Sequence, residues 1–153
     1  ALNQFSPRLT QDIKDSLVAA YTAMGQITTI GNLRPFAQAA KETGWFTSER
    51  FLDGFNPAGL GATNDGAWGS TFDSPSSGVL AQYCHLLCYC TKPDSASFLF
   101  ERLAQLSPRV LEMTDEHGRG SATTWGGLDG RWAVPGDRYG ETILLIADAI
   151  KKL

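Results

Sequence analysis

One glutamate, Glu42, has neighbours that suit proton transfer. It lies near the end of an alanine-rich stretch, 37–48, with the sequence AQAAKETGWFTS. The residues one helical turn earlier, Gln38 and Ala39, carry no positive charge that would hold the carboxylate ionised. The negative end of a helix and the two aromatic residues that follow would both raise the pKa of this carboxyl group. A carboxyl group that keeps its proton near neutral pH is what general acid catalysis requires.

A turn and a tyrosine have residue types that are suited to contacts with a ligand. In the segment 55–61, the side chain of Asn56 is able to fix a turn, and Gly59 allows the backbone to approach a ligand closely. Tyr139 begins a stretch of helical spacing, and a tyrosine is able to bury its ring while its hydroxyl group stays exposed. Each candidate has an ordinary alternative: Glu42 as a solvated glutamate at a helix end, and Tyr139 as an amphipathic ring at a helix start.

The elements that must position these residues are predicted from the spacing of apolar side chains. Helical spacing or capping signals are found in five segments: 10–25, 33–46, 76–90, 93–106 and 139–153. The first helix is expected to be capped by Thr10 and to end at Gly25, and the third to be capped by Ser76 or Ser77. One apolar stripe is predicted along the first helix, formed by Ile13, Leu17, Val18, Tyr21 and Met24. The small alanines of the second helix permit close packing and predict a central position for it.

Strand signals are weak along the whole chain. The segments 53–78 and 116–130 are rich in glycine and turn residues, which favours irregular chain, a tight hairpin or an exposed loop. The predicted fold class is therefore mainly α, an α+β arrangement with a small irregular or β lobe beside the site. At 153 residues the chain is expected to form one domain, 1–153.

Composition and charge argue against several kinds of partner. The net charge of −3 gives no electrostatic footprint for nucleic acid or for an anionic membrane surface. No apolar run approaches the roughly 20 residues that span a bilayer. We expect a soluble chain, and we expect it to be a monomer, either alone or within a longer protein.

Three clustered cysteines, Cys84, Cys88 and Cys90, are an odd number and a poor framework for disulfides. We expect them to be reduced and mostly buried thiols. The neighbouring His85 raises the alternative of a zinc site. On a helix, however, Cys90 would point away from the other two, and no second ligand pair completes a tetrahedral site. We expect neither a metal nor any other cofactor.

Four stretches together resemble the bacterial glucosaminidase family, glycoside hydrolase family 73, of the lysozyme-like superfamily. The first, 37–48, is similar to the family's catalytic signature, in which an alanine-rich helix ends in Glu-Ser-Gly-Trp-Gly-Thr-Ser. The second, 55–61, resembles the family's Asn-Leu-Phe-Gly-Ile-Lys turn. The third is Phe-Asp-Ser-Pro at 72–75 with the helix after it, and the fourth is the segment 130–143 around Trp-Ala and Tyr139. The four follow one another in the family's order and extend over most of the chain.

The resemblance implies a lysozyme-like fold and an endo-β-N-acetylglucosaminidase that cuts the glycan strands of peptidoglycan. It implies that Glu42 is the proton donor and that Tyr139 lies near it in the catalytic site. Residues implied or expected to bind the glycan are Trp45, Asn56, Gly59, Trp68 and Trp132. Exposed aromatic rings suit the apolar C–H faces of sugars, although a tryptophan is individually more often a core residue.

The second catalytic group remains open at the level of sequence. The interval in which the family usually carries another acid contains one acidic residue, Asp65, and Asp73 lies just beyond it. Either carboxylate could activate water. The position of Asp73 before Ser74 and Pro75 also suits a role at the start of a helix. The remaining possibilities are assistance from the acetamido group of the substrate, or no protein base at all.

Two other functions compete with this interpretation. A muramidase or lytic transglycosylase of the same superfamily would cut the other β-1,4 bond, and a transglycosylase needs only one acid. A module that binds the wall without cutting it is the non-enzymatic alternative. Each of these functions predicts a protein that is secreted, associated with the cell wall, or delivered to the wall by a bacteriophage.

Overall fold

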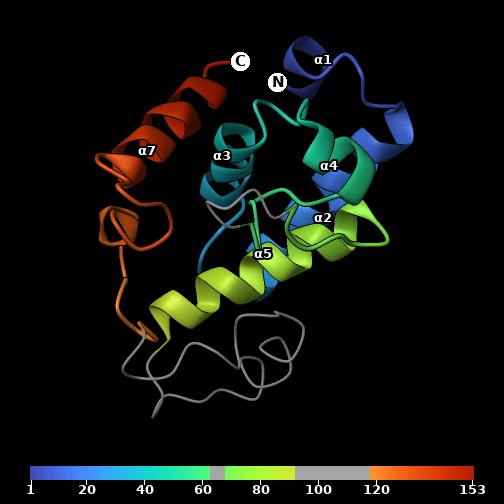
Figure 1. The fold of residues 1–153 in the computed structure, drawn as a ribbon. Coiled ribbons are helices and arrows are strands. Elements are labelled where there is room, and N and C mark those ends of the chain that lie inside the picture. The colour runs from blue at the N-terminus through green and yellow to red at the C-terminus, as the bar shows by residue number, and fades with distance from the viewer. Residues whose placement is uncertain (63–67, 92–117) are drawn as a thin grey trace.

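The computed structural model describes residues 1–62, 68–91 and 118–153, and within them the protein is mainly α-helical (Figure 1). The only pairing of β type in these residues is an isolated bridge between Asp129 and Ala133. The prediction of a mainly α fold is therefore confirmed. The described elements are α1 (Leu2–Phe5), α2 (Gln11–Ile27), α3 (Leu33–Glu42), α4 (Glu49–Gly54), α5 (Pro75–Cys90), the 3-10 helix η3 (Gly126–Leu128) and α7 (Tyr139–Ile150).

Helix α2 begins as its sequence indicates but ends later. The Thr10 hydroxyl accepts a hydrogen bond from the backbone N–H of Ile13, which satisfies a free donor at the helix start. The helix continues through Gly25 to Ile27. Gly25 lies where the chain packs against Asn32, since a β-carbon built on it would be 2.7 Å from the Asn32 β-carbon. Val18, expected in the core, is 56% exposed.

Helix α3 ends at Glu42, four residues before the predicted boundary at Phe46. The carbonyl oxygen of Ala39 accepts from both the backbone N–H and the hydroxyl group of Thr43. The same hydroxyl accepts from the N–H of Phe46, which in a continued helix would bond to the carbonyl oxygen of Glu42. Gly44, Trp45 and Phe46 then all adopt positive φ. This left-handed turn sends the chain into α4 and leaves Glu42 as the last residue of its helix.

Helix α5 starts at Pro75, and its cap is Ser74 instead of the predicted Ser76 or Ser77. The Ser74 hydroxyl accepts from the N–H of Ser77, and Pro75 occupies the first turn, where no backbone N–H is needed. A β-carbon on Gly78 would lie 1.9 Å from the carbonyl oxygen of Phe55. The glycine therefore allows α5 to pack directly against the turn that follows α4.

The core forms around α3, which lies beside α7 in Figure 1 and contributes to two apolar clusters. On one side, Ala37 packs with residues of α5 and α7, including Leu86 and Ile143. On the other side, Ala39 and Ala40 pack with residues of α2, α4 and α5. The central position predicted for this alanine-rich helix is thus observed.

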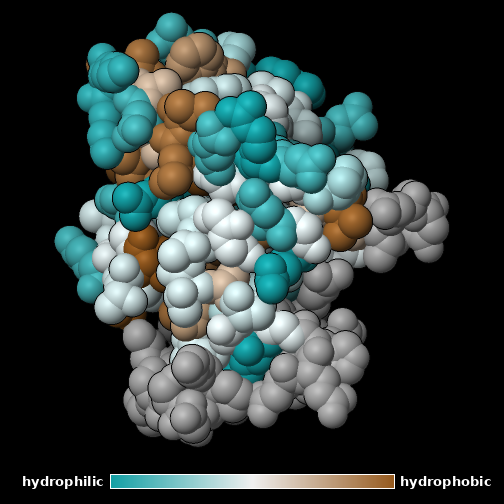
Figure 2. Space-filling model, turned by 90° about the vertical axis from the view of Figure 1, so that its left-hand side faces the viewer, coloured by the Kyte–Doolittle hydropathy of each residue, from teal (hydrophilic) through white to brown (hydrophobic). Residues whose placement is uncertain are grey.

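In the segment predicted to be irregular, 53–78, residues 55–62 and 68–74 contain neither helix nor strand. The prediction was wrong at both ends, because 53–54 belong to α4 and 75–78 to α5. Helix α7 ends at Ile150, close to its predicted end, and buries Ile143 and Ala147. Figure 2 shows the side of the molecule that carries α7, where apolar and polar areas are interspersed, and Leu145 on this helix is 61% exposed. The helix predicted over 93–106 lies outside the described residues. None of the described helices has the length and apolar character needed to cross a bilayer.

Candidate active site

The carboxyl group of Glu42 is half-buried at the C-terminal end of α3. Its Oε1 atom accepts a hydrogen bond of 2.6 Å from the hydroxyl group of Tyr139, a residue 97 positions away in the sequence. The two residues that the sequence placed in the catalytic site are therefore in direct contact. A hydrogen bond as short as this one to a carboxylate is typical of a strong, charge-assisted interaction.

Burial raises the pKa of Glu42 above the ordinary value for a glutamate. Three weaker influences act in the opposite direction: the hydrogen bond from Tyr139 and the positive charges of Lys41 and Arg50 each lower the pKa. The direction expected from the sequence is confirmed, with desolvation as the main cause. The side chain is thus protonated over a wider pH range than a solvated glutamate would be.

Tyr139 is buried, with 2% of its surface exposed. It has one contact at its hydroxyl oxygen and another at its ring. Its hydroxyl oxygen accepts a hydrogen bond of 2.9 Å from Nε2 of Gln38 on α3. The Nζ atom of Lys41 lies 4.9 Å from the centre of its ring, within range of a cation–π contact. Burial and the nearby Glu42 raise the pKa of Tyr139 far above neutral, so the tyrosine acts as a hydrogen-bond donor.

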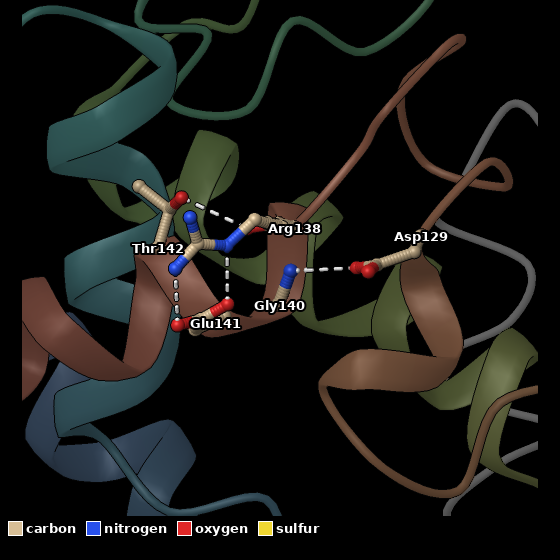
Figure 3. Close-up of polar contacts among 5 residues, drawn as sticks. All are labelled: Asp129, Arg138, Gly140, Glu141 and Thr142. Atoms are coloured by element: carbon tan, nitrogen blue, oxygen red, sulfur yellow. Dashed lines mark hydrogen bonds and ion pairs between the residues drawn. The ribbon is translucent and has the colours of Figure 1, made fainter.

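Tyr139 is the first residue of α7, and Figure 3 shows the polar contacts of the residues around it at the helix start. Arg138 precedes the helix in a left-handed conformation, and its guanidinium group makes two hydrogen bonds of 2.6 Å with Glu141. The backbone N–H of Gly140 donates to Asp129 Oδ1 at 2.8 Å, which satisfies a free donor in the first turn. A β-carbon on Gly140 would be 2.2 Å from the carbonyl oxygen of Trp125. This glycine therefore allows the helix start to lie directly against the loop before it.

Asn56 organises the turn that the sequence linked to the site. Its Nδ2 atom donates to the carbonyl oxygens of Leu60 and Ser70, both at 2.9 Å. Its Oδ1 atom accepts from the backbone N–H groups of Ala58 and Leu60 at 3.3 and 3.0 Å. Only 1% of Asn56 is exposed. Its side chain is therefore occupied within the protein, and any effect it has on a ligand is through the shape of the turn.

Gly59 lies in this turn directly beside Glu42. It has a φ of +65°, and a β-carbon built on it would be 3.8 Å from Glu42 Oε2 and 4.0 Å from Arg50 Nη1. Gly59 has no side chain to contact this second carboxyl oxygen, and its left-handed backbone favours glycine. Three of the stretches singled out in the sequence, around Glu42, Gly59 and Tyr139, thus meet at one carboxyl group.

Arg50 is a site residue that the sequence did not reveal. It lies in the first turn of α4, and its charge acts on the Glu42 carboxyl group. Its Nε atom is buried and has no hydrogen-bond partner among the described residues. No motif marks this position, because its approach to Glu42 depends on the left-handed turn that connects α3 to α4.

The three tryptophans predicted to bind a ligand have different surroundings. The Trp45 ring packs against Phe5 of α1, with 4.4 Å between ring centres. Trp68 is 47% exposed. Trp132 is half-buried, packs against the apolar cluster that includes residues of the turn, and lies edge-on to His85 with ring centres 4.7 Å apart. Of the three, Trp68 has the most surface available to a ligand.

The candidate bases remain unassigned. Asp65 lies outside the described residues, and Asp73 is exposed beside Ser74, the cap of α5. The described ends of the segment that contains Asp65 adjoin the turn of Asn56, since the N–H of Ser70 donates to the carbonyl oxygen of Leu60 at 2.8 Å. The prediction that one of the two aspartates is a base remains a prediction.

The cysteines form no disulfide, and Cys84 and Cys88 are buried. Burial raises the pKa of the Cys84 thiol to about 12 and that of Cys88 to about 11, which disfavours the thiolate form that metals and electrophiles require. Within the described residues, no three side chains of His, Cys, Asp or Glu are grouped as metal ligands.

Comparison of the chain with protein-family models, with curated proteins and with solved structures gave no match in any of the three. The described residues of the site form a half-buried carboxyl group with one oxygen held by a tyrosine and the other beside a glycine turn, and the charge of Arg50 acts on this group. This arrangement is suited to proton transfer.

Proposed function

We propose that this protein is a peptidoglycan hydrolase and that Glu42 is its general acid. The observation that carries the proposal is the position of Glu42, where burial raises the pKa of a carboxyl group with an oxygen beside Gly59. A protonated carboxyl group at this position is able to give its proton to the oxygen of a glycosidic bond. The resemblance to family 73 glucosaminidases supplies the substrate class, the glycan strand of the bacterial wall.

In the proposed reaction, the Glu42 proton passes to the glycosidic oxygen as the bond from that oxygen to the anomeric carbon breaks. Glu42 becomes a carboxylate, which the Tyr139 hydroxyl and the charges of Lys41 and Arg50 stabilise. A water molecule then adds to the anomeric carbon and loses a proton. If Asp65 or Asp73 is the base, its carboxylate takes this proton. If the acetamido oxygen of the substrate first bonds to the anomeric carbon, the Glu42 carboxylate takes the proton from the water that opens this bond, and Glu42 is protonated again.

By resemblance, the bond cut is the one between N-acetylglucosamine and N-acetylmuramic acid, which makes the protein an endo-β-N-acetylglucosaminidase. A lytic transglycosylase of the same superfamily is the second candidate. It is favoured by one observation: among the described residues, the charged groups that act on Glu42 are both cations. A reaction with a single carboxyl group is therefore compatible with this part of the site.

Digestion of purified peptidoglycan, followed by mass spectrometry of the products, tests the proposal. We expect new reducing ends of N-acetylglucosamine. A reducing N-acetylmuramic acid would indicate a muramidase, and an anhydro-sugar end would indicate a transglycosylase. Binding to the wall without any new end would contradict the enzymatic proposal and identify a wall-binding module. The proposed substrate also implies action at the wall, after secretion or after delivery by a bacteriophage.

A further inference from the structure

A continuous chain of hydrogen bonds runs through the core from α2 to Glu42. Tyr21 Oη donates to Gln82 Oε1 at 2.8 Å, and Gln82 Nε2 donates to Gln38 Oε1 at 2.8 Å. Gln38 Nε2 donates to Tyr139 Oη at 2.9 Å, and Tyr139 donates to Glu42 Oε1 at 2.6 Å. The four side chains that precede Glu42 in this chain are all buried. Every donor in the chain points in the direction of Glu42.

The direction of these hydrogen bonds is fixed by one backbone group, the carbonyl group of Pro35. Gln82 Nε2 also donates to the carbonyl oxygen of Pro35 at 2.9 Å. A carbonyl oxygen only accepts hydrogen bonds, so the NH2 end of Gln82 must lie on this side. The atom of Gln38 that faces this NH2 group must then be its oxygen, which turns the NH2 end of Gln38 toward Tyr139. Since the Tyr139 oxygen accepts there, its single hydrogen is directed to Glu42.

We infer that Gln38 and Gln82 are positioning residues for Glu42, which direct the Tyr139 hydroxyl to Oε1 and leave Oε2 as the oxygen that carries the exchangeable proton. The oxygen that accepts the Tyr139 hydrogen is the carbonyl-like one in the protonated carboxyl group. Oε2 is the oxygen beside Gly59. The inference rests on the proposed function only in treating this proton as the one given to the substrate.

The other charged groups that act on the carboxyl group are Lys41 of α3 and Arg50 of α4. Both cations favour the ionised form of Glu42. The hydrogen-bond chain differs from them because it distinguishes the two oxygens. Removal of a glutamine from this series of hydrogen bonds should therefore change the pKa of Glu42 by weakening the hydrogen bond from Tyr139, since no charge is removed.

The test is an NMR titration of the Glu42 side-chain carboxyl carbon in carbon-13 labelled protein, with the signal assigned by its loss in Glu42→Gln. In Tyr139→Phe the hydrogen bond to the carboxylate is absent, and we expect the pKa of Glu42 to rise by about 1. In Gln38→Met, which has a similar volume but no amide, the Tyr139 hydroxyl is no longer polarised or directed. We expect a rise of about half that size.

The double variant shows whether Gln38 acts through Tyr139. In the Tyr139→Phe background, Gln38→Met should cause no further rise in the pKa of Glu42. Tyr21→Phe is the matched control, because it removes a buried hydroxyl group from the same chain but leaves the carbonyl of Pro35 to orient Gln82. It should lower thermal stability without changing the titration of Glu42.

An unchanged pKa in folded Gln38→Met would overturn the inference, as would a rise of equal size with and without Tyr139. If Gln38→Met does not fold, Gln82→Met tests the same series of hydrogen bonds one residue earlier. Without the NH2 group of Gln82, the Gln38 amide is free to reverse and to turn its oxygen toward the Tyr139 hydroxyl group. The expected result is again a raised pKa. This titration needs no substrate, so a failure of the proposed function would appear separately, as retained lysis by Glu42→Gln.

Discussion

The carboxyl group of Glu42 experiences opposing influences of different physical origin. Desolvation favours the protonated form, while Tyr139, Lys41 and Arg50 favour the ionised form, and desolvation prevails. A general acid must be protonated before the reaction and stabilised as a carboxylate after it. The arrangement around Glu42 meets both needs, because the same groups that moderate its pKa surround the carboxylate that proton transfer leaves behind.

The pH dependence of lysis should follow this balance. Activity is lost as the pH rises through the pKa of Glu42, since the ionised form has no proton to give. In Arg50→Met a cation that favours ionisation is absent, so the pKa of Glu42 rises and the alkaline limb of the pH–activity profile moves upward by about half a pH unit. Arg8→Met, at an exposed position, should leave the profile unchanged. Movement of the limb to lower pH in Arg50→Met would contradict the proposed electrostatics.

The two aspartates are expected to respond differently to loss of their charge. Asp73 is exposed next to the cap of α5, so Asp73→Asn should leave lysis within about threefold of the wild type. If Asp65 activates the water, Asp65→Asn should reduce turnover by about 10²–10⁴-fold. Kinetic measurements on purified wall compare the two variants. Full activity in both would exclude these residues as bases and leave either assistance by the acetamido group of the substrate or a transglycosylase reaction that needs no base to activate water.

At the scale of elements, the start of α7 determines the position of Tyr139. Gly140→Ala would place a methyl group 2.2 Å from the carbonyl oxygen of Trp125, so the helix start must move away from the loop. We expect a loss of about 1–3 kcal/mol in the free energy of unfolding, together with reduced lysis. Gly126→Ala in the same loop is the matched control, because a β-carbon there meets nothing within 4 Å. Chemical denaturation measures both, and equal stability of the two variants would show that the close contact is unimportant.

Much of the helical framework could be predicted from local patterns. The Thr10 cap, the terminal helix and the central alanine-rich helix each depend on side chains close together in the sequence. The boundaries that were wrong depend on tertiary contacts or on local competition for hydrogen bonds. Gly25 remains helical, and α3 ends early where the Thr43 hydroxyl takes the N–H of Phe46, which would otherwise bond to the carbonyl oxygen of Glu42.

The site itself could be predicted only in part. Glu42, Gly59 and Tyr139 could be proposed because each belongs to a segment with a recognisable local pattern of residues, and the structure places Gly59 and Tyr139 beside Glu42. No sequence pattern indicates a role for Arg50 or for the buried Gln38 and Gln82. Their roles follow from the way α3, α4, α5 and α7 pack, and this packing is not encoded in the spacing of any one segment.

For the molecule as a whole, the cysteines are expected to be structural and the activity independent of metal. Cys84 and Cys88 are buried with raised pKa values, so both should react slowly with alkylating reagents in the folded protein and quickly after unfolding. Mass spectrometry of the labelled protein measures this difference. A chelator should leave lysis unaltered. Loss of activity with a chelator, restored by zinc, would reveal a metal requirement that contradicts this account.

The central claim is that Glu42 supplies the proton that breaks the glycosidic bond. Glu42→Gln keeps the shape and hydrogen-bonding capacity of the side chain but removes the transferable proton. Glu49→Gln is the same change at an exposed position in the first turn of α4 and serves as the control. Circular dichroism and thermal unfolding establish that both variants are folded.

The decisive measurement is the rate at which each folded variant releases new reducing ends from purified peptidoglycan. We predict that Glu42→Gln is slower than the wild type by about 10²–10⁴-fold, while Glu49→Gln retains the wild-type rate. A folded Glu42→Gln protein with more than about a tenth of the wild-type rate would contradict the assignment of Glu42 as the general acid.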